Sequence, residues 1–376
     1  MEKYKTIDLC AGIGGIRRGF EMTGRFETVL SAEIDKYACA TYEHLFGENP
    51  FNDLSSREFL EKTKKVSYDV LLAGFPCQPF SRAGLQKGTN DEKRGNIFFN
   101  LCNIIITTRP KAIFLENVDN LAYIDKGKTF TDIINMLETD LDYRVIGTVR
   151  NLIGFHCDPK DLIRNSANFG IPQNRHRMYV VAFDKRRYWK YIDHLPAVIP
   201  SKGRETIYKD LGDLLEYGAP PKYYLSSGLL ETLEKHKERH GAKNHGFGYQ
   251  IVNKPDGEKH VANTVMATGG SGRERNLVVD EQDGIPGMVC SSKKTPLNDK
   301  CVRSMTPREW GKLQGFINYG FLDENGNDNF SFPEGVSDIQ QYKQFGNSVT
   351  IPVIRTMADF MLDCFKILHE PMENAV

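Results

Sequence analysis

The chain has 376 residues, and its 49 Lys and Arg balance 49 Asp and Glu, so the formal net charge is zero. A content of 40% hydrophobic and 26% charged residues is typical of a globular protein of two domains, or of one large and one small domain. No apolar run approaches the length of about 18 residues that a membrane-spanning helix needs, and the polar N-terminus resembles neither a signal nor a transit peptide. The eight cysteines form no Cys-x-x-Cys pair, so the sequence predicts no metal site and no disulfide framework, as suits a reducing cytoplasm.

The chain begins with a β-α-β pattern. Residues 5–15 are an apolar strand followed by a glycine-rich turn, residues 16–24 have helical spacing, and residues 29–33 form a second strand. The glycines of the turn are Gly12, Gly14 and Gly15. Glycines let a ligand approach the backbone closely, and Glu33 follows them by about 20 residues, where an acid typically binds ribose hydroxyls. The pattern favours a nucleoside cofactor over a plain tight turn, although the spacing is not that of the dinucleotide fingerprint.

Acidic side chains also follow two later strands. Asp53 comes after the next helix, at the expected end of a strand, where an ordinary loop aspartate is the alternative. Glu116 lies near the end of an apolar strand at residues 111–118. Burying an unpaired carboxylate is costly, so Glu116 is a poor residue for filling a core and a candidate for function.

The stretch at residues 69–84 reads DVLLAGFPCQPFSRAG. Its short apolar strand is broken by Gly74, Pro76 and Pro79, so Cys77 lies just past the carboxyl end of a strand, on a backbone that prolines stiffen. Ligands of open α/β sheets bind at that end of the strands. The Cys77 thiol is therefore a candidate nucleophile, and the alternative is a small buried side chain.

Two arginines precede the last strand of this pattern. A helix at residues 129–141 and a strand at 143–149 lead into an irregular stretch at 150–165, and Arg175 and Arg177 then alternate before an apolar run. Strand alternation would place both guanidinium groups on one face, and a solvated strand edge is the alternative. The repeated alternation of strands and helices predicts a doubly wound α/β sheet.

The sequence changes character after this pattern. Residues 196–335 are loop-rich and predict a second, smaller domain, whereas residues 1–195 and 336–376 together form the first. A helix at 305–316 begins at a threonine N-cap, and a Gly-Asn-Ser turn containing Asn347 opens a long amphipathic helix that returns to the first domain.

Basic residues gather in two parts of the second domain. One part is a helix at residues 225–240, and the other follows a glycine-rich loop, with a strand GFGYQIV between them. The residues concerned are Lys235, Lys237, Arg273 and Arg275. Basic groups beside flexible glycines suit contact with a nucleic-acid backbone and with base edges, and the alternative is a solvated basic surface.

Six motifs now stand in order along the chain. They are Ala-Gly-x-Gly-Gly at 11–15, Glu33, Pro-Cys-Gln at 76–78, Glu-Asn-Val at 116–118, Gln-x-Arg-x-Arg at 173–177 and Gly-Asn-Ser-Val at 346–349. In this order and spacing the chain resembles the C5-cytosine DNA methyltransferases along nearly its whole length. The resemblance implies a Rossmann-like, S-adenosylmethionine-dependent methyltransferase sheet with a smaller target-recognition domain.

The resemblance also assigns roles in catalysis. Cys77 would add to carbon 6 of cytosine, Glu116 would act at ring N3, and Arg177 would hold the ring O2. Arg175 would support Glu116 or contact a phosphate, and Ser81 with the lid that follows would close over a base flipped out of the duplex.

For the cofactor, the resemblance implies S-adenosylmethionine. The residues expected to hold it are Cys10, Gly12, Gly14, Gly15, Glu33, Ile34, Asp53 and Asn347. Two of them depart from the family pattern, since Cys10 stands where the family usually has Phe and Ile34 where it often has Trp. Both changes thin the aromatic lining of the adenine pocket.

The second domain resembles the target-recognition region of the HpaII-type methyltransferases. This implies a cytosine within CCGG as the target, with CCNGG or CCWGG as the fallback, in double-stranded DNA. It further implies a monomeric, nucleoid-associated enzyme in a bacterial cytoplasm, of the restriction-modification type, with a cognate endonuclease that cuts the same site.

Three other functions remain open on the sequence. A tRNA cytosine-5 methyltransferase of the same superfamily would share the catalytic motifs but not the long recognition region. An NAD-dependent oxidoreductase would use the first β-α-β unit but leave Cys77, Glu116 and the arginine pair without a joint role. A catalytically silent DNA-binding protein would have no use for Cys77 and Glu116 together.

Overall fold

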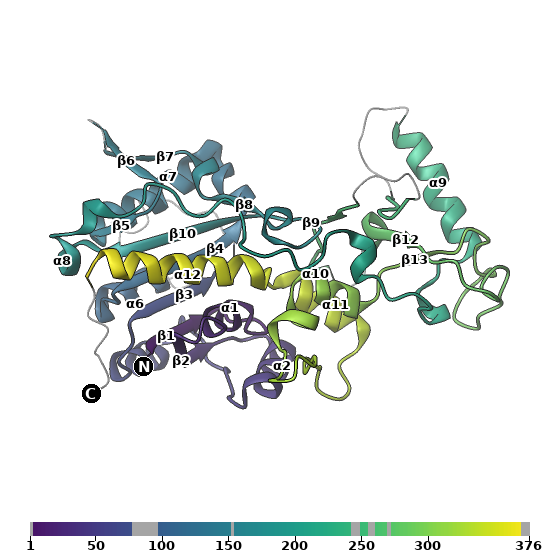
Figure 1. The fold of residues 1–376 in the computed structure, drawn as a ribbon, viewed down its shortest axis with the longest axis horizontal. Helices are drawn as coiled ribbons and strands as arrows, with labels where there is room; N and C mark the ends of the chain where they lie inside the picture. The colour runs from purple at the N-terminus through teal and green to yellow at the C-terminus, as the bar shows by residue number, and fades with distance from the viewer. Residues whose placement is uncertain are drawn as a thin grey trace. The chain divides into compact units, whose positions relative to one another are not determined.

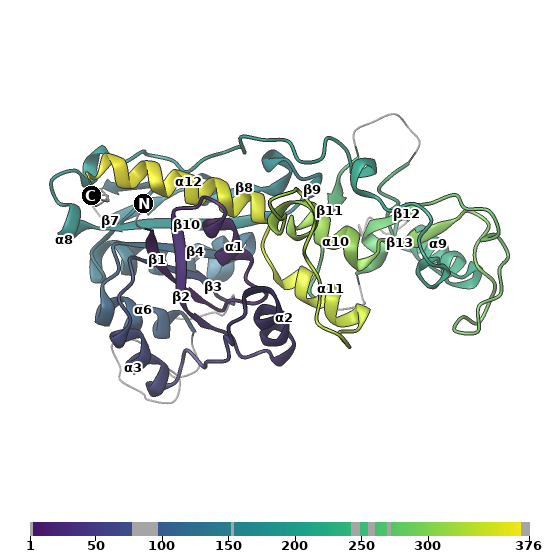
Figure 2. The same cartoon turned by 60° about the horizontal axis from the view of Figure 1, so that its bottom comes forward.

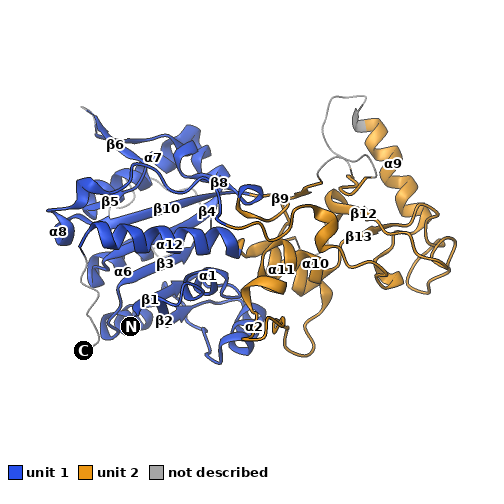
Figure 3. Ribbon diagram, in the orientation of Figure 1, with its two compact units in different colours: residues 1–168, 176–204, 351–376 blue, residues 169–175, 205–350 orange. Residues whose placement is uncertain are grey.

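The computed structural model describes residues 3–76, 97–151, 154–241, 249–254, 260–268 and 272–369. The chain divides into two compact units, shown in different colours in Figure 3. Unit 1 comprises Met1–Asn168, His176–Arg204 and Ile351–Val376, and unit 2 comprises Phe169–Arg175 and Glu205–Thr350. Compared with the expected second domain at 196–335, unit 2 begins later, extends further, and includes a short segment that precedes the last long strand.

Unit 1 is built on one seven-stranded sheet. Its order is β2-β1-β3-β4-β10-β5, and β8 also pairs with β10. The strands are β1 Tyr4–Leu9, β2 Phe26–Ala32, β3 Val70–Gly74, β4 Ala112–Val118, β5 Tyr143–Val145, β8 Ile163–Asn165 and β10 His176–Asp184. Strands β1 to β4 are parallel to one another, whereas β10 runs antiparallel to β4, β5 and β8. The carboxyl ends of β1, β3 and β4 therefore lie at one edge of the sheet.

Helices cover both faces of this sheet. They are α1 Gly15–Glu21, α2 Lys36–Phe46, α3 Arg57–Lys65, α6 Ile97–Thr108, α7 Lys128–Asn135, α8 Lys185–Tyr188 and α12 Ile351–Ile367. Alternate residues of β4 face opposite ways: Ile113 belongs to the core that includes α6 and α7, whereas the Phe114 ring meets Phe20 of α1 edge-on, with centroids 5.2 Å apart. Figure 2 shows α12 on one side of the sheet and α3 and α6 on the other, which is the predicted doubly wound arrangement.

Two helices are packed so closely that a glycine is required between them. A Cβ on Gly19 of α1 would lie 2.5 Å from the Ile354 side chain of α12. The C-terminal helix, yellow in Figure 1, is therefore an integral layer of unit 1. Among the described residues no helix is long and apolar enough to cross a bilayer.

The sequence led us to expect an irregular stretch at 150–165, and this expectation was wrong. The stretch contains most of a hairpin, β6 Thr148–Asn151 and β7 Gly154–Cys157, and then β8, which joins the main sheet. The expected single strand at 143–149 is broken after β5 by Gly147, whose φ of 96° suits glycine.

In the described residues of unit 2, all strands are short. They are β9 Gln173–Asn174 paired with β11 Ala262–Asn263, and β12 Leu277–Val279 paired with β13 Val302–Ser304. Its helices include α9 Ser227–Gly241, α10 Pro307–Leu313 and α11 Asp338–Asn347. The described part of the expected strand GFGYQIV forms a single bridge at Ile251 rather than a strand.

The ends of two helices bear on the predictions. As expected, α10 begins at the Thr306 N-cap, whose side chain accepts from the Glu309 N–H in a capping box. The Gly-Asn-Ser turn, by contrast, does not open the long helix. Gly346 and Asn347 are the last residues of α11, and α12 starts only at Ile351.

Candidate functional site

The glycine-rich turn and the acid predicted to accompany it are in contact. The Glu33 carboxylate accepts hydrogen bonds from the backbone N–H groups of Gly12 at 2.8 Å, Ile34 at 2.7 Å and Asp35 at 2.8 Å. These three bonds fix the carboxylate against the turn between β1 and α1. Residues about 20 positions apart in the sequence are thus in contact, and their role in binding a cofactor stays a prediction.

The three glycines of the turn have different surroundings. A Cβ on Gly12, where φ is 56°, would meet nothing within 4 Å, so the space beside it is open to a ligand. A Cβ on Gly14 would lie 2.2 Å from the Phe46 ring, so packing against α2 requires that glycine. Gly15 is the buried first residue of α1.

Exposed apolar side chains flank this open space. Ile34 is 64% exposed and Phe51 is also 64% exposed, and Phe51 is bridged through its backbone to Glu33. Asp53 follows, exposed, and accepts from the Ser55 backbone at 2.8 Å. An acid and two exposed apolar groups beside an open turn fit a ligand with ribose and a flat base. The sequence analysis did not identify Phe51, because it belongs to none of the recognised motifs.

Cys10 and Asp8 line the base of the turn. Burial raises the pKa of the Cys10 thiol, and the nearby carboxylates of Glu33 and Asp8 raise it further. Burial likewise raises the pKa of Asp8, and the Arg17 guanidinium only partly opposes this. A thiol held in its neutral form is a weak nucleophile, so Cys10 belongs to the wall of the site and not to its chemistry.

A second group of predicted residues lies at the ends of β4 and β10. The Arg177 Nε is 3.3 Å from the Glu116 Oε1, and the two side chains are only 13% and 11% exposed. A Cβ on Gly74, the last residue of β3, would lie 3.5 Å from the Glu116 Oε2. The Asn117 Nδ2 donates to the Phe75 carbonyl at 2.9 Å, which ties β4 to the backbone just past β3.

This second group presents a nearly buried carboxylate and a guanidinium side by side. Such a pair can hold a polar ring by donating to its oxygen and exchanging a proton with its nitrogen. Cys77 and Ser81 lie outside the described residues, but Phe75, which Asn117 holds, is only two positions before Cys77.

Arg175 and Arg177 do not share a face, contrary to the expectation from alternation. Arg177 belongs to β10, whereas Arg175 precedes that strand and is 2% exposed within unit 2. The Arg175 guanidinium donates to the carbonyls of Val265 at 2.9 Å, Gly346 at 3.0 Å and Ser348 at 2.5 Å. These bonds join three segments of unit 2, so Arg175 positions the backbone around the Gly-Asn-Ser turn. Asn347, the middle residue of that turn, is exposed.

The four basic residues predicted to contact nucleic acid differ in their surroundings. On α9, the Lys235 Nζ is 2.5 Å from the Glu231 carboxylate and the Lys237 Nζ lies 5.0 Å from the centre of the Tyr249 ring. Arg273 is half-buried, with its guanidinium 5.0 Å from the centre of the buried Tyr342 ring, whereas Arg275 is exposed.

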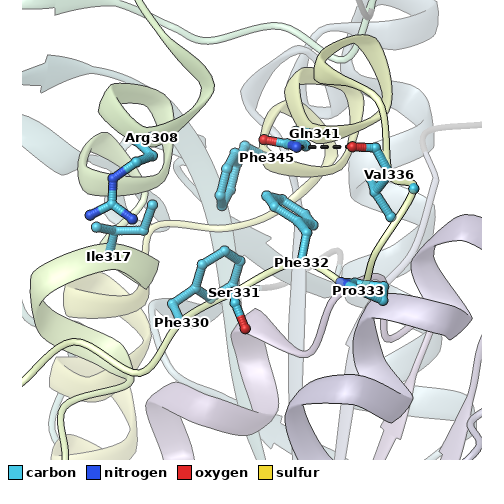
Figure 4. A pocket seen from close by; sticks show the side chains of 10 residues that line it. Arg308, Ile317, Phe330, Ser331, Phe332, Pro333, Val336, Gln341 and Phe345 are labelled. Carbon is cyan, nitrogen blue, oxygen red and sulfur yellow. Dashed lines mark hydrogen bonds between the residues drawn. The ribbon is translucent and has the colours of Figure 1, made fainter.

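One cavity of about 400 Å³ lies within unit 2 (Figure 4). Phe330, Phe332 and Phe345 converge on it, and the Gln341 amide beside them donates to the Val336 carbonyl at 3.0 Å. None of the predicted site residues lines this aromatic cavity. Among the described residues, no three His, Cys, Asp or Glu side chains gather in a way that could hold a metal ion.

Comparison with known proteins gives the site its context. The model of the family "C-5 cytosine-specific DNA methylase" matches residues 4–362. The type II methyltransferase M.HpaII of Haemophilus parainfluenzae is 40% identical, over 98% of this chain and 92% of its own length. The type II methyltransferase M1.ScrFI of Lactococcus lactis subsp. cremoris is 37% identical, over 96% of this chain and 78% of its own length.

A solved structure shows the same fold. The Entamoeba histolytica methyltransferase EhMeth superposes with a TM-score of 0.66 at 21% identity, over 97% of this chain and 99% of its own. Together with the family match, this fold makes S-adenosylmethionine the cofactor, and the Glu33 turn of unit 1 has the open space and the acid to receive it. The chain belongs to the C-5 cytosine-specific DNA methylase family and is a DNA cytosine-5-methyltransferase of the type II restriction-modification kind.

Proposed function

We propose that this enzyme methylates carbon 5 of a cytosine in CCGG through a covalent adduct with Cys77. The observation that carries the proposal is the Glu116–Arg177 pair, 3.3 Å apart and nearly buried, at the end of the strand next to β3. The chain reaches Cys77 three residues after β3 ends. The reaction requires an acid, a guanidinium and a thiol, and Glu116, Arg177 and Cys77 would be these three groups.

The chemistry follows from the weakness of cytosine as a nucleophile at carbon 5. Addition of the Cys77 thiolate forms a sulfur–carbon bond at carbon 6 and turns the ring into an enamine. Glu116 relieves the charge at ring N3 by sharing a proton with it, while Arg177 donates to the ring O2. Bound S-adenosylmethionine supplies an electrophilic methyl group. Once carbon 5 is methylated, it loses its proton to a base, and the bond to Cys77 breaks.

The cofactor would be held by the turn of unit 1 and by the other residues that the sequence predicts for it. Gly12 would let the cofactor approach the backbone, and Gly14 would shape the turn through its packing against Phe46. Glu33 would bind the ribose hydroxyls, and Ile34 and Asp53 would flank the base. Gly15, Cys10 and Asn347 complete the expected set. Positions 10 and 34 lack the aromatic side chains that the family pattern has there. Phe51, which is 64% exposed, can supply part of the missing aromatic surface.

Other parts of the chain would act on the duplex. The target base must leave the stack to be reached, so Ser81 and the residues after it would close over the flipped cytosine. Lys235 and Lys237 would contact phosphates from the exposed helix α9. Arg175 would act as a positioning residue through the backbone carbonyls that it holds.

The target and the setting of the enzyme also belong to this proposal. The HpaII-like recognition region favours CCGG, with CCNGG or CCWGG as the fallback. We place the enzyme in a bacterial cytoplasm, associated with the nucleoid as a monomer, with an endonuclease that cuts the same site. The bacterial type II relatives support this placement.

The proposal is tested by two measurements on the purified protein. Bisulfite sequencing of a randomised duplex library after methylation should recover CCGG, and recovery of sites without CC and GG would remove the target. A duplex with 5-fluorocytosine at that site should trap an adduct on Cys77, because fluorine cannot leave as a proton does. An adduct on another cysteine, or none, would remove the covalent mechanism, and faster methylation of tRNA than of duplex would favour the alternative substrate.

A further inference from the structure

Three segments of unit 2 that are distant in sequence meet around Asn263. Its side-chain Nδ2 donates to the Gln250 Oε1 at 3.0 Å and to the Arg275 carbonyl at 2.8 Å. Its backbone N–H donates to the Asn276 Oδ1 at 2.7 Å, and its carbonyl accepts from the Asn276 Nδ2 at 3.1 Å. Asn276 is 1% exposed and anchors Asn263, which is half-buried. Asn263 in turn holds Gln250 and Arg275, which are exposed.

The backbone of this cluster is fixed as well. The Gln250 N–H donates to the Glu274 carbonyl at 2.9 Å, and the Gln250 carbonyl accepts from the Leu277 N–H at 2.9 Å. Arg275 lies in the short 3-10 turn Arg273–Asn276, which leads directly into β12. Figure 2 labels both β12 and β11, the strand that contains Asn263. Gln250 and Arg275 are therefore exposed side chains on a backbone held from both sides, which is how preorganised recognition groups are arranged.

Both exposed groups present hydrogen-bond donors. The Gln250 Oε1 accepts from Asn263, and no acceptor among the described residues bonds its Nε2, so the two N–H groups of this exposed side chain are available to a ligand. The Arg275 side chain contacts the Met266 sulfur at 3.7 Å through one guanidinium nitrogen, a weak partner that leaves most of its donors available. In the major groove, guanine offers two acceptors, O6 and N7, and no donor there.

We propose that Gln250 and Arg275 form a paired donor surface that reads adjacent guanines of the target, with Asn263 as the positioning residue that sets the orientation of both. This deepens the proposed target, on which it rests for the identity of the bases. A donor-only surface matches the GG step that CCGG shares with CCNGG and CCWGG. Adenine would fit less well, because its N6 is a donor that would face another donor.

The same geometry separates Arg275 from Arg273, although both follow the glycine-rich loop. The Arg273 guanidinium lies over Tyr342, which is fully buried and donates its hydroxyl to the Met305 carbonyl at 2.5 Å. A guanidinium committed to a buried ring supports the packing of the turn. Arg273 is therefore assigned to holding the turn, and Arg275 to reading a base.

The experiment uses the full-length enzyme and its own site, as recovered from the randomised library. Gln250→Glu keeps an oxygen for Asn263 but removes the donors, and Arg275→Ala removes the guanidinium. For each, kcat/KM is measured on the cognate duplex and on duplexes with one base pair changed. Discrimination at one guanine should fall about 5- to 150-fold, the equivalent of roughly 1–3 kcal/mol per base contact. Arg308→Ala, an exposed arginine of the same unit that pairs with Glu216, is the matched control and should leave discrimination unchanged.

A second probe separates base reading from a structural role. Replacing one target guanine by 7-deazaguanine removes N7, which should slow methylation by the wild type. The variant that lacks the residue reading that guanine has already lost the contact, so the replacement should slow it no further. Equal losses on every duplex, or losses from 7-deazaguanine that simply add to those of both variants, would overturn the inference. If the library recovers a different sequence, the proposed target falls, but the same measurements at that sequence still decide whether Gln250 and Arg275 read it.

Discussion

The most severe perturbation of unit 2 should be the loss of Arg303. This side chain of β13 is fully buried, and its five N–H donors all have acceptors. The Nε donates to Asp280 at 2.8 Å, and the two terminal nitrogens donate to the Glu309 carboxylate at 2.8 and 2.9 Å. The remaining two bonds go to the carbonyls of Ser304 and Glu216, both at 3.1 Å.

Arg303→Met would keep a long side chain but leave two carboxylates buried without a cation. Asp280 is 1% exposed and Glu309 is not exposed at all. Removing one partner of a buried ion pair costs about 3–5 kcal/mol, and here one arginine serves two carboxylates. We therefore expect the free energy of unfolding to fall by at least about 4 kcal/mol, a large share of the roughly 5–15 kcal/mol of a typical domain.

The two tryptophans of the chain provide the assay. Trp310 of α10 is 2% exposed in unit 2, whereas Trp189 is 71% exposed in unit 1. In a Trp189→Phe background, urea titration followed by Trp310 fluorescence reports the unfolding of unit 2. Arg308→Met is the control, because Arg308 is also on α10 but half-exposed in its pairing with Glu216, where exposed pairs contribute up to about 1 kcal/mol.

Acid should destabilise the same cluster. Burial is the largest single influence on Asp280 and opposes its charge, but the hydrogen bonds from Arg303, Tyr224 and the Ala219 backbone, together with the positive charge of Arg303, hold the pKa of the carboxyl below its ordinary value. The stability from this carboxylate is present above the unfolded pKa of about 3.9 and is lost as pH falls through the lower folded pKa. An Arg303→Met protein that unfolds within 1 kcal/mol of the parent, or an Arg308→Met protein that loses as much, would refute this reasoning.

Three further changes test unit 1 and the turn of unit 2. Arg177→Ala should lower kcat for methyl transfer by about 10²-fold or more, since Glu116 loses its partner and the ring its donor, while S-adenosylmethionine binding by calorimetry stays the same. Gly346→Ala should lower the free energy of unfolding by about 2–3 kcal/mol in denaturant titration, because its Cβ would lie 2.3 Å from the Met266 carbonyl and the backbone must shift; an unchanged midpoint would contradict this packing. Asp8→Asn should flatten the pH dependence of stability: the folded pKa of Asp8 is raised by burial, so the parent loses stability as pH rises from about 4 through that pKa, and thermal melts of the two proteins should diverge over that range.

The sheet of unit 1 could be predicted because its strands carry strong local signals. The strand before Cys77 is a fully apolar run that follows Asp69, and the apolar run at 111–118 has Glu116 near its end, so both element type and direction followed from the pattern. The hairpin at 148–157 has no such signal, since it alternates weakly and Val149 in it is 65% exposed. A hairpin with little buried surface cannot be distinguished from a loop by periodicity alone.

The site could be predicted where the residues that meet come from neighbouring elements of one β-α-β unit. Glu33 and Gly12 met as expected because β1 and β2 are adjacent and parallel. Arg175 and Arg177 were misplaced relative to each other because alternation holds only within a strand, and nothing local shows that β10 starts at His176. The Gln250 cluster had no motif at all, because it exists only where three distant segments converge.

Unit 2 shows how such a cluster can be held without a large sheet. The strands in its described part have only two or three residues, so ladder hydrogen bonds alone cannot fix its loops. Buried polar groups fix the loops instead: Arg175 donates to three carbonyls, Arg303 donates to five acceptors, and Asn276 anchors Asn263. Hydrogen bonds are directional, so a satisfied buried network specifies one arrangement where an apolar core would tolerate several. The Gln250 and Arg275 side chains are exposed at the edge of this network, which holds Arg275 through its backbone carbonyl and Gln250 through its Oε1. Arg275→Ala and Gln250→Glu keep these two acceptors, so they should alter which bases are read while leaving the melting temperature close to that of the parent.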